Sequence, residues 1–526
     1  MKRLILTGFM GTGKSTVGRL LADRFGLDVI DIDAEIERRT GRTIRGIFEA
    51  DGEDSFRAIV STVFREALQG ESDVVVTGGG TLVSPDNRSR LNDGETVLVL
   101  TCSTDELQSR LEGVRDRPLM PSAGRDAIEA LLRRRAEVYG MFPQIDTTGR
   151  SPDEVVSLLA SGWDVREAAF LRMERSFASA VIFERGAAFR SLDVSRGLAS
   201  ARQILVVVDG NVATSGSAGR VIDGLRSGGA EVSDFVIEPG EESKQMETVM
   251  RLYHACLSAG FERHAYVVGL GGGMVCDVAA FVAATYMRGI RLVLLPTTLL
   301  AQVDAAIGGK AGVDLDGAKN MVGAFYPAEE VILDPDLLTT LPSHSFSDGM
   351  AEVVKISCIR SKSLFEKIEK LRCAKSVLDA PTIIRRAASE KVRVVQDDPF
   401  EHGIRGLLNF GHTVGHAIES ASDFALAHGQ AVAIGMRAEA RLAADLQLCS
   451  PEIVDRLDLV LDRMGLARNL PGLDMSRVTT FLLQDKKRRS GHLRFALPTG
   501  LGRGEMVEVT HRDAAQAFAH AQGAMS

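Results

Sequence analysis

The sequence lacks the long apolar runs that would anchor it in a membrane. No stretch approaches the roughly 18 consecutive apolar residues of a membrane span, and the run Leu4 to Leu6 is too short for a signal-peptide core. The six cysteines are scattered without a CxxC pair or an even framework, which is typical of reduced thiols. We therefore expect a soluble cytoplasmic protein.

Dense basic blocks are also missing. The 62 Lys and Arg residues stand against 70 Asp and Glu residues, the net charge is −8, and no cluster would follow a nucleic-acid backbone. We therefore predict small-molecule substrates as partners, with neither nucleic acid nor membrane. With 526 residues, the chain is too long for one hydrophobic core, and roughly two to four domains are expected.

Histidine is absent from the first half of the chain. All ten histidines lie at or beyond His254, so chemistry in the first half cannot use histidine as a ligand or a base. The two halves are therefore expected to do different jobs.

The first half opens with a phosphate-binding pattern. A β-rich run, Arg3 to Thr7, precedes GFMGTGKS, Gly8 to Ser15, and a helical pattern follows, so that G-x-x-x-x-G-K-[ST] has its strand–loop–helix context. Backbone N–H groups can approach phosphates at the glycines, Lys14 reaches the β and γ phosphates, and Ser15 can hold Mg²⁺. The predicted nucleotide contacts are Gly11, Thr12, Gly13, Lys14, Ser15 and Thr16.

Polar residues follow the later strands of this half. Asp31 and Asp33 end the strand DVIDID, where a parallel sheet places binding residues, although a helix cap and a solvated carboxylate would explain them equally well. The next candidates along the chain are Arg57, the loop Thr77 to Gly80, Arg117 in VRDRPLM, and Arg133 to Arg135. The glycines could form only a tight turn, and the arginine run could be a solvated helix face.

These motifs resemble shikimate kinase in order and spacing over residues 1–165. The resemblance implies a P-loop domain with a parallel sheet that phosphorylates shikimate with ATP and Mg²⁺. It implies that Asp31 lies near Mg²⁺, that Asp33 holds the substrate hydroxyls, and that Lys14 and Arg117 act on the phosphates. The groups implied to bind shikimate are Asp33, Arg57, Gly78, Gly79, Gly80 and Arg135. The segment YGMFPQIDTT departs from the family pattern on the adenine side.

A change of pattern separates the halves. Residues 166–178 are predicted as a linker that forms a helix or a tether. The run Leu205 to Asp209 then predicts a buried parallel strand, with Asn211 just beyond it. A second strand, Tyr266 to Leu270, runs into the Gly-rich turn Gly271 to Asp277, where a backbone could approach a pyrophosphate. Alternating strands and helices predict an open α/β sheet over residues 179–335 and a mainly helical domain over residues 336–526.

The helical part contains a candidate metal site in LLNFGHTVGHAIES and AHGQAVAIGM. His412 and His416 lie four apart on a predicted helix, so spacing alone predicts that both bind one metal together with His428. Hydrogen-bonded core histidines are the other interpretation. Glu352, a helical neighbour of Lys355, would complete a three-ligand catalytic zinc site or else lie on the surface. Four residues in Gly-rich segments could form an anion site or be surface groups: Arg288, Lys310, Lys319 and Asn320.

From about residue 180 to the end the chain resembles 3-dehydroquinate synthase, through PGEESK, ATYMRG, PTTLLAQVD, GAKN, GMAEVVK, LNFGHTVGHAIE, HGQAVAIGM and DKK. The resemblance implies an NAD-binding α/β domain and a helical metal domain. It makes Glu352, His412 and His428 the ligands of one divalent metal, Zn²⁺ or Co²⁺, and turns His416 to the substrate. The implied NAD contacts are Asp209, Asn211, Glu241, Lys244, Gly272, Gly273, Asp277, Thr297, Thr298, Lys310 and Lys319. The implied catalytic and substrate groups are Lys310, Lys355, Lys391, Arg405, His416, Arg288, Asn320, Asn409 and one of Lys486 and Lys487.

The complete chain therefore resembles a bifunctional enzyme of aromatic amino acid biosynthesis by the shikimate pathway. Its second activity would convert 3-deoxy-arabino-heptulosonate 7-phosphate to 3-dehydroquinate with release of phosphate, while NAD⁺ is regenerated. We also predict a homodimer formed through the second half. Two residues depart from the synthase pattern: Cys276 could tighten the pyrophosphate turn, and Pro399 replaces a glutamate. The alternative is a regulatory P-loop module fused to a metal-dependent polyol dehydrogenase.

Overall fold

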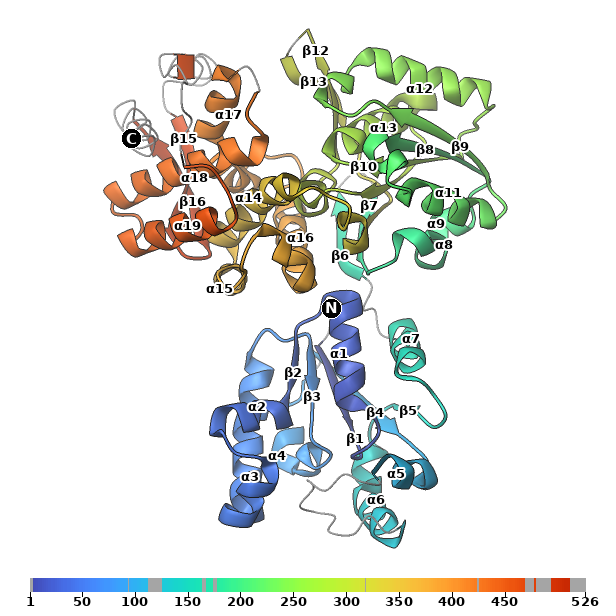
Figure 1. Cartoon of the computed structure of the whole chain (residues 1–526), viewed down its shortest axis with the longest axis vertical. Helices are drawn as coiled ribbons and strands as arrows, with labels where there is room; N and C mark the ends of the chain where they lie inside the picture. Colours follow the sequence, from blue (N-terminus) through green and yellow to red (C-terminus); the bar gives the residue numbers. More distant parts are fainter. Residues whose placement is uncertain are drawn as a thin grey trace. The chain divides into compact units, whose positions relative to one another are not determined.

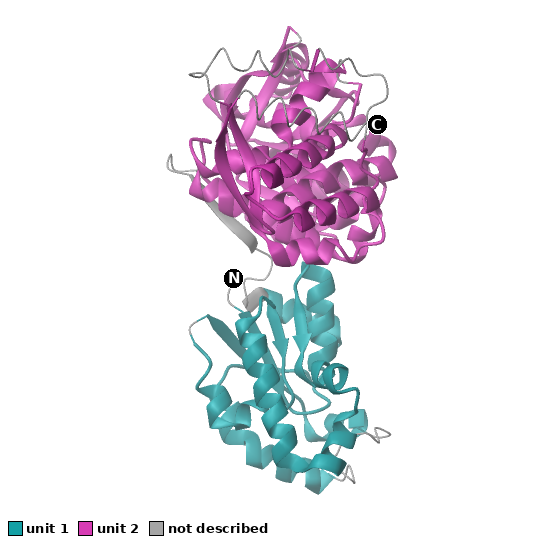
Figure 2. Cartoon of the chain, turned by 90° about the vertical axis from the view of Figure 1, so that its left-hand side faces the viewer, with its two compact units in different colours: residues 1–166 teal, residues 167–526 magenta. Residues whose placement is uncertain are grey.

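The structure is a computed structural model of the chain. It describes residues 3–92, 94–111, 125–162, 167–173, 177–316, 318–422, 425–468, 477–478 and 493–510. The chain divides into two compact units, Met1–Arg166 and Glu167–Ser526 (Figure 2). No helix among the described residues is long and apolar enough to cross a membrane.

The first unit is built on a five-stranded parallel sheet in the order β2-β3-β1-β4-β5 (Figure 1). Its strands are β1 (Arg3–Gly8), β2 (Val29–Asp31), β3 (Val74–Val76), β4 (Glu95–Thr101) and β5 (Gln144–Asp146). Its helices are α1 (Lys14–Phe25), α2 (Ile32–Thr40), α3 (Ile44–Gln69), α4 (Pro85–Arg88), α5 (Thr104–Leu111), α6 (Arg125–Tyr139) and α7 (Pro152–Gly162). The loops that leave the carboxyl ends of β1, β2 and β3 lie on one edge of the sheet, where ligands bind in such folds.

The strands of this sheet are buried on both faces, as continuous apolar runs predict. Leu4 and Leu6 of β1 pack in a cluster with residues of α1 and α7, whereas Ile5 between them packs with residues of α2 and α3. Because successive side chains of a strand point to opposite faces, one short apolar strand holds two layers of helices.

The second unit contains a seven-stranded sheet in the order β6-β7-β14-β11-β10-β8-β9. Its strands are β6 (Glu167–Met173), β7 (Phe177–Phe183), β8 (Gln203–Asp209), β9 (Glu231–Ile237), β10 (Tyr266–Gly271), β11 (Arg291–Pro296) and β14 (Glu330–Leu333). Its main helices are α11 (Ser217–Ser227), α12 (Met246–Ser258) and α13 (Gly273–Thr285), with the shorter α8 (Ser191–Val194), α9 (Arg196–Ala199) and α10 (Gly210–Thr214). A separate hairpin consists of β12 (Lys310–Leu315) and β13 (Ala318–Phe325).

The segment between the halves differs from the prediction. Residues 166–178, predicted as a helix or tether, contain β6 and the first residues of β7, which pair antiparallel. Strand β7 also pairs in parallel with β14, more than 140 residues later in the chain. A local pattern could not show this pairing, because the partner strand lies far away in sequence.

The remainder of the second unit is mainly helical. Its helices are α14 (Ser343–Arg360), α15 (Lys362–Ile368), α16 (Pro381–Asp397), α17 (His412–Ala421), α18 (His428–Asp445) and α19 (Pro451–Arg463), and a hairpin of β15 (Leu493–Gly500) and β16 (Arg503–Val509) follows. One apolar cluster runs from Val275 of α13 through Phe346 of α14 to Val432 of α18. The boundary predicted at residue 335 therefore lies inside one compact unit with a shared core. The predicted fold class, two α/β parts followed by a mainly helical part, is confirmed.

Candidate active sites

The loop between β1 and α1 forms a concave backbone surface at a helix N-terminus. Gly11 and Gly13 adopt left-handed conformations, with φ of 82° and 89°, and a side chain at Gly13 would meet open space. The Thr12 hydroxyl and the Lys14 ammonium both donate to the Phe9 carbonyl at 2.8 Å, which holds the loop closed. Exposed N–H groups at the positive end of a helix dipole suit a phosphate chain.

Beside this loop lies a cavity of about 620 Å³ in which charged groups of both signs converge. Its lining includes Ser15, Asp31, Asp33, Phe48, Phe56, Arg57, Gly78, Gly79, Gly80 and Arg135. The Ser15 hydroxyl donates to Asp31 at 2.6 Å, and Asp31 in turn caps the N-terminus of α2. The helix cap and the binding role considered for Asp31 are therefore compatible.

Each glycine of the triplet 78–80 leaves room for one charged side chain. A Cβ atom would lie 2.7 Å from Asp33 Oδ1 at Gly78, 2.6 Å from Arg135 Nη1 at Gly79, and 2.2 Å from Arg57 Nη1 at Gly80. None of the three glycines has the positive φ that would mark a turn requiring glycine. The triplet does form a turn, in which the Thr81 N–H donates to the Gly78 carbonyl at 3.1 Å, but the need for glycine comes from the close approach of the three charged groups.

Arg57 and Arg135, two of the three arginines among the described lining residues, differ in their partners. Arg135 is 5% exposed, and its buried Nη1 lacks a hydrogen-bond partner among the described residues. Arg57 pairs with Glu53 at 3.0 Å. The Arg135 guanidinium also lies 5.6 Å from the Phe9 ring centroid and contacts Tyr139, but a buried nitrogen without a hydrogen bond is costly, and a planar anion would supply the missing acceptor. The solvated-helix interpretation holds for Arg133 and Arg134, which are exposed, but not for the buried Arg135.

Arg110 was not singled out in the sequence. Its guanidinium donates to the Gly11 carbonyl at 3.2 Å and to the Thr147 carbonyl at 3.1 Å, which ties the phosphate loop to the segment after β5. Only the meeting of two distant loops reveals this role. Arg117, predicted to act on the phosphates, lies outside the described residues.

In the second unit, three helices bring a carboxylate and two imidazoles together. Glu352 comes from the middle of α14, while His412 and His428 are the first residues of α17 and α18. Both imidazole Nε2 atoms face Glu352 Oε1, at 3.6 Å from His412 and 3.5 Å from His428. One possible ligand atom from each residue lies within 4.8 Å of the other two. Two imidazoles and a carboxylate form a donor set that suits a catalytic zinc or cobalt ion.

The charged groups of this cluster shift one another's pKa values. Glu352 is 2% exposed and forms an ion pair with Lys355, which is equally buried. Burial and the Lys355 charge lower the pKa of His412 well below its usual value. Burial alone would lower the pKa of His428 as well, but its contacts with Glu352 and Glu419 raise that pKa to about 10.

His416 takes a different position from His412. It belongs with Glu419 and His428 to a second group whose possible ligand atoms lie close together, and it is not among the atoms around Glu352. Glu419, which the sequence analysis missed, lies 3.2 Å from His428 Nδ1. A carboxylate on the far ring nitrogen fixes the orientation of an imidazole whose other nitrogen faces a metal. Spacing alone predicted that His412 and His416 face one ion together. The geometry instead favours His412 with Glu352 and His428.

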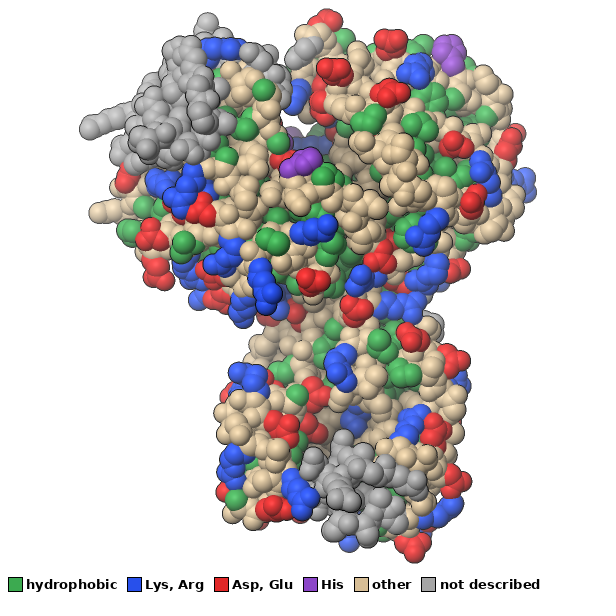
Figure 3. All heavy atoms as spheres, viewed as in Figure 1, with side chains coloured by type: hydrophobic (Ala, Val, Ile, Leu, Met, Phe, Trp, Pro, Cys, Tyr) green, Lys and Arg blue, Asp and Glu red, His purple; other side chains and the backbone are tan. Residues whose placement is uncertain are grey.

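A group of cations lies close to this cluster. Lys391 pairs with Asp304 of the π-helical turn Ala301–Ala305, and burial lowers the pKa of Lys391. Arg405 is 2% exposed and donates to the Gly308 carbonyl at 3.3 Å. Lys310 pairs with Glu401 at 2.5 Å, and Asn409 donates to the same carboxylate. Figure 3 shows histidine and cationic side chains at a hollow in this unit.

Other predicted substrate groups are less closely joined to this cluster. Arg288 is exposed after α13, and among the described residues it makes none of the contacts that hold the cluster together. Lys486 and Lys487 lie outside the described residues. The backbone of Pro399 accepts a hydrogen bond from Arg405, a role that does not depend on its side chain.

The predicted dinucleotide contacts lie after the carboxyl ends of β8, β9, β10 and β11 and on the β12–β13 hairpin. Asp209 accepts a hydrogen bond from the Asn211 N–H at 2.8 Å, and Gly272 begins α13 next to Thr298. Lys244 donates to both Asp277 and Asn320 at 2.6 Å, which links the sheet edge to the β12–β13 hairpin. The remaining predicted residues on these segments are Glu241, Gly273, Thr297 and Lys319.

Cys276 was expected to tighten the pyrophosphate turn, and its thiol donates a hydrogen bond to the Gly271 carbonyl of that turn at 3.8 Å. It lies inside α13, is 1% exposed and packs in the apolar core. The thiol therefore fills the core as a small apolar side chain and also ties the first turn of α13 to Gly271.

Comparisons with known proteins match both units. The shikimate kinase family matches residues 10–161, and the N-terminal and C-terminal families of 3-dehydroquinate synthase match residues 234–348 and 349–488. The bifunctional shikimate kinase/3-dehydroquinate synthase of Thermotoga maritima is 32% identical over 515 residues, 96% of this chain and 98% of that protein.

Two solved structures resemble the second unit. The 2-epi-5-epi-valiolone synthase of Streptomyces hygroscopicus subsp. jinggangensis 5008, with NAD⁺ and Zn²⁺ bound, is 28% identical with a TM-score of 0.60 and covers 67% of this chain and 98% of its own. A 2-deoxy-scyllo-inosose synthase complexed with carbaglucose-6-phosphate, NAD⁺ and Co²⁺ is 26% identical with a TM-score of 0.59 and covers the same shares.

Proposed function

The chain belongs to the family of bifunctional shikimate kinase/3-dehydroquinate synthases, and on that premise we propose that the first cavity binds shikimate and the Glu352 cluster holds a divalent metal. The enzyme phosphorylates shikimate with ATP and converts the heptulosonate phosphate to 3-dehydroquinate with release of phosphate. The comparisons do not favour the alternative of a regulatory module fused to a polyol dehydrogenase.

In the kinase unit, some residues of the cavity would bind the substrates and others would neutralise the charge of the phosphates. The loop N–H groups and Lys14 would hold the ATP phosphates, and the adjacent Ser15 and Asp31 oxygens would hold Mg²⁺. Arg135, with Arg57, would bind the shikimate carboxylate, because the buried Arg135 Nη1 needs an anionic partner. Asp33, next to Gly78 on the same wall, would orient the hydroxyl that receives the phosphoryl group.

In the synthase unit, NAD⁺ supplies a reversible hydride acceptor and the metal a Lewis acid. The ligands would be Glu352, His412 and His428. The observation that carries this assignment is that these residues converge from three helices. Lys391, Arg405 and Lys310 would hold the phosphate and carboxylate groups of the substrate. His416, outside the ligand set, would hold or move a proton at its imidazole. Asp209, Asp277 and the Gly272 turn would hold the dinucleotide.

One experiment tests both assignments on the same purified chain. Protein stripped by dialysis against a chelator, then freed of chelator and supplied with Mg²⁺ and NAD⁺, should form ADP with shikimate and release no phosphate from the heptulosonate phosphate. Added Zn²⁺ or Co²⁺ should restore phosphate release. Unchanged phosphate release after stripping, or stoichiometric consumption of NAD⁺, would contradict the synthase assignment.

The cellular setting and the assembly are further parts of the proposal. All six cysteines are unpaired thiols, which fits the reducing cytoplasm. We propose a homodimer that forms through the second unit, where the outer edge of β6 has no paired strand among the described residues. Mass determination in solution tests this, and a monomer would contradict it.

A further inference from the structure

Glu439 is a fully buried acid with no role in the assignments above. It lies on α18, is 0% exposed, and accepts hydrogen bonds from the N–H groups of Gly411 at 2.5 Å and Val414 at 3.1 Å. A third bond comes from the Thr413 N–H. These donors belong to the first turn of α17, where N–H groups lack partners within the helix. Gly411 itself, at the N-cap, supplies no side chain, so Glu439 caps α17 from another helix.

The arrangement is costly, which indicates that it serves a purpose. Burial raises the pKa of Glu439 to about 8, although its three hydrogen bonds oppose that rise. An apolar residue would avoid the cost of burying an acid. Departures from the rule that a protein interior is apolar occur most often near functional sites.

The spacing along α18 aligns Glu439 with a proposed metal ligand. His428 and Glu439 are eleven residues apart, 439 − 428, or about three helical turns, so both project from one face. Gly435 lies between them on that face, and a Cβ atom there would stand 1.9 Å from the Gly411 carbonyl oxygen. The two helices therefore cross in backbone contact, with little freedom to slide.

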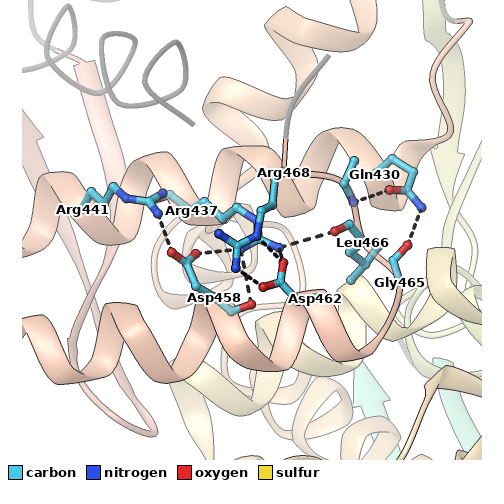
Figure 4. Close-up of polar contacts among 9 residues, drawn as sticks. Gln430, Arg437, Arg441, Asp458, Asp462, Gly465, Leu466 and Arg468 are labelled. Carbon is cyan, nitrogen blue, oxygen red and sulfur yellow. Dashed lines mark hydrogen bonds and ion pairs between the residues drawn. The ribbon is translucent and has the colours of Figure 1, made fainter. Parts of the chain in front are cut away.

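The opposite face of α18 is fixed to α19. Arg437, 1% exposed, pairs with Asp458 at 2.8 Å and with Asp462 at 2.9 Å (Figure 4). Near the start of the helix, the Gln430 side chain accepts from the Ala467 N–H at 2.6 Å. Helix α18 is thus fixed to α19 on one side, and Glu439 connects its other side to the N-terminus of α17.

We propose that Glu439 is a positioning residue that fixes the first turn of α17, and with it His412, against Glu352 and His428. This inference rests on the proposed metal site. His412 is the residue directly after the capped Gly411, so a shift of that turn moves the imidazole. Among the described residues, the side chain that accepts hydrogen bonds from this turn is that of Glu439.

The test is metal affinity measured by competition with a chromogenic chelator, using Zn²⁺ on the full chain. At pH 9, above the pKa of about 8, Glu439 is ionised; in Glu439→Gln an amide N–H₂ group then replaces one acceptor and faces backbone donors, so the Kd for Zn²⁺ should rise by about 10- to 100-fold. The KM for shikimate and the kcat of the kinase unit should not change. Glu439→Asp keeps the acid but shortens its reach, so it should weaken binding less and serves if the amide variant does not fold.

Asp334→Asn is the matched control. Asp334 is also 0% exposed and accepts from the N–H groups of Gly186 and Ala188, away from the metal cluster. This variant should lower thermal stability and leave the Kd for Zn²⁺ within about twofold of wild type. Wild-type Zn²⁺ affinity in both Glu439 variants, or equal weakening in the control, would overturn the inference. A wild-type chain that binds no Zn²⁺ would instead overturn the proposed metal site.

Discussion

Glu352 and Lys355 form an ion pair in which each side chain is 2% exposed, one helical turn apart on α14. The carboxylate also faces two imidazoles, so Lys355 neutralises a group that we propose as a metal ligand. A buried charge that loses its partner is strongly destabilising. The pair therefore couples the stability of the metal-free protein to the charge of Lys355.

We predict that Lys355→Met destabilises the metal-free synthase unit by about 3–5 kcal/mol and that Zn²⁺ restores most of the loss. The ion would replace the ammonium as the counter-charge of Glu352. Denaturant midpoints measured by far-UV circular dichroism, with and without Zn²⁺, check this. A deficit of the same size in both states would show that the ion does not meet Glu352.

Replacing each histidine of the HxxxH motif should separate their roles. His412→Ala should leave the purified protein with little bound metal, because it removes one of three proposed ligands. His416→Ala should retain the metal and lose phosphate release, since its ring is not among the atoms around Glu352. Metal content per chain by mass spectrometry is the measurement. Full occupancy in His412→Ala would remove that residue from the ligand set.

The two active sites should be chemically independent. Lys14→Ala should reduce shikimate-dependent ADP formation on the order of 100-fold or more, because the phosphate charge loses its cation. Phosphate release by the synthase should stay near the wild-type rate in the same preparation. A comparable loss of both activities would contradict independence.

Gly80→Ala should weaken shikimate binding by displacing Arg57. The added Cβ would stand 2.2 Å from Arg57 Nη1, so the guanidinium must move. Loss of a charge-assisted hydrogen bond is worth about 1.5–3 kcal/mol, or about 10- to 100-fold in kcat/KM. In an Arg57→Ala background the same change should have little further effect. Additive losses would show that Gly80 acts independently of Arg57.

Binding of NAD⁺ should weaken as the pH falls through about 6. Burial raises the pKa of Asp277 to about 6, although Lys244 opposes the rise, and the ionised form is the one that accepts hydrogen bonds from a cofactor hydroxyl. Protonation below that pKa removes the acceptor, so affinity should fall by about tenfold from pH 7 to pH 5. NADH fluorescence titration measures this. Asp277→Asn should bind more weakly without that pH dependence, and an unchanged profile would exclude Asp277 as the titrating group.

Contiguous motifs were well predicted because their chemistry is local. The phosphate loop needs only a strand, glycines and a helix start in sequence, and the structure has all three between Arg3 and Phe25. The family and the two activities that the resemblances implied are confirmed by the comparisons, and the two similar synthase structures carry NAD⁺ with Zn²⁺ or Co²⁺. The strands β6, β15 and β16 were not foreseen, because strand pairing depends on partners that a local pattern does not contain.

Sequence alone determined which side chains each helix can present together. The spacing of four put His412 and His416 on one face of a helix, but both then seemed equally suited to one ion. The family resemblance assigned only His412 to the metal, and the tertiary structure favours the same division for a physical reason: α14 brings Glu352 to His412, while His416 lies with Glu419 and His428. The same holds for Glu439, whose burial at the start of α17 depends on the crossing of two helices. Helical periodicity fixes direction within one element, whereas the partner that a side chain meets is fixed by the packing of elements against one another.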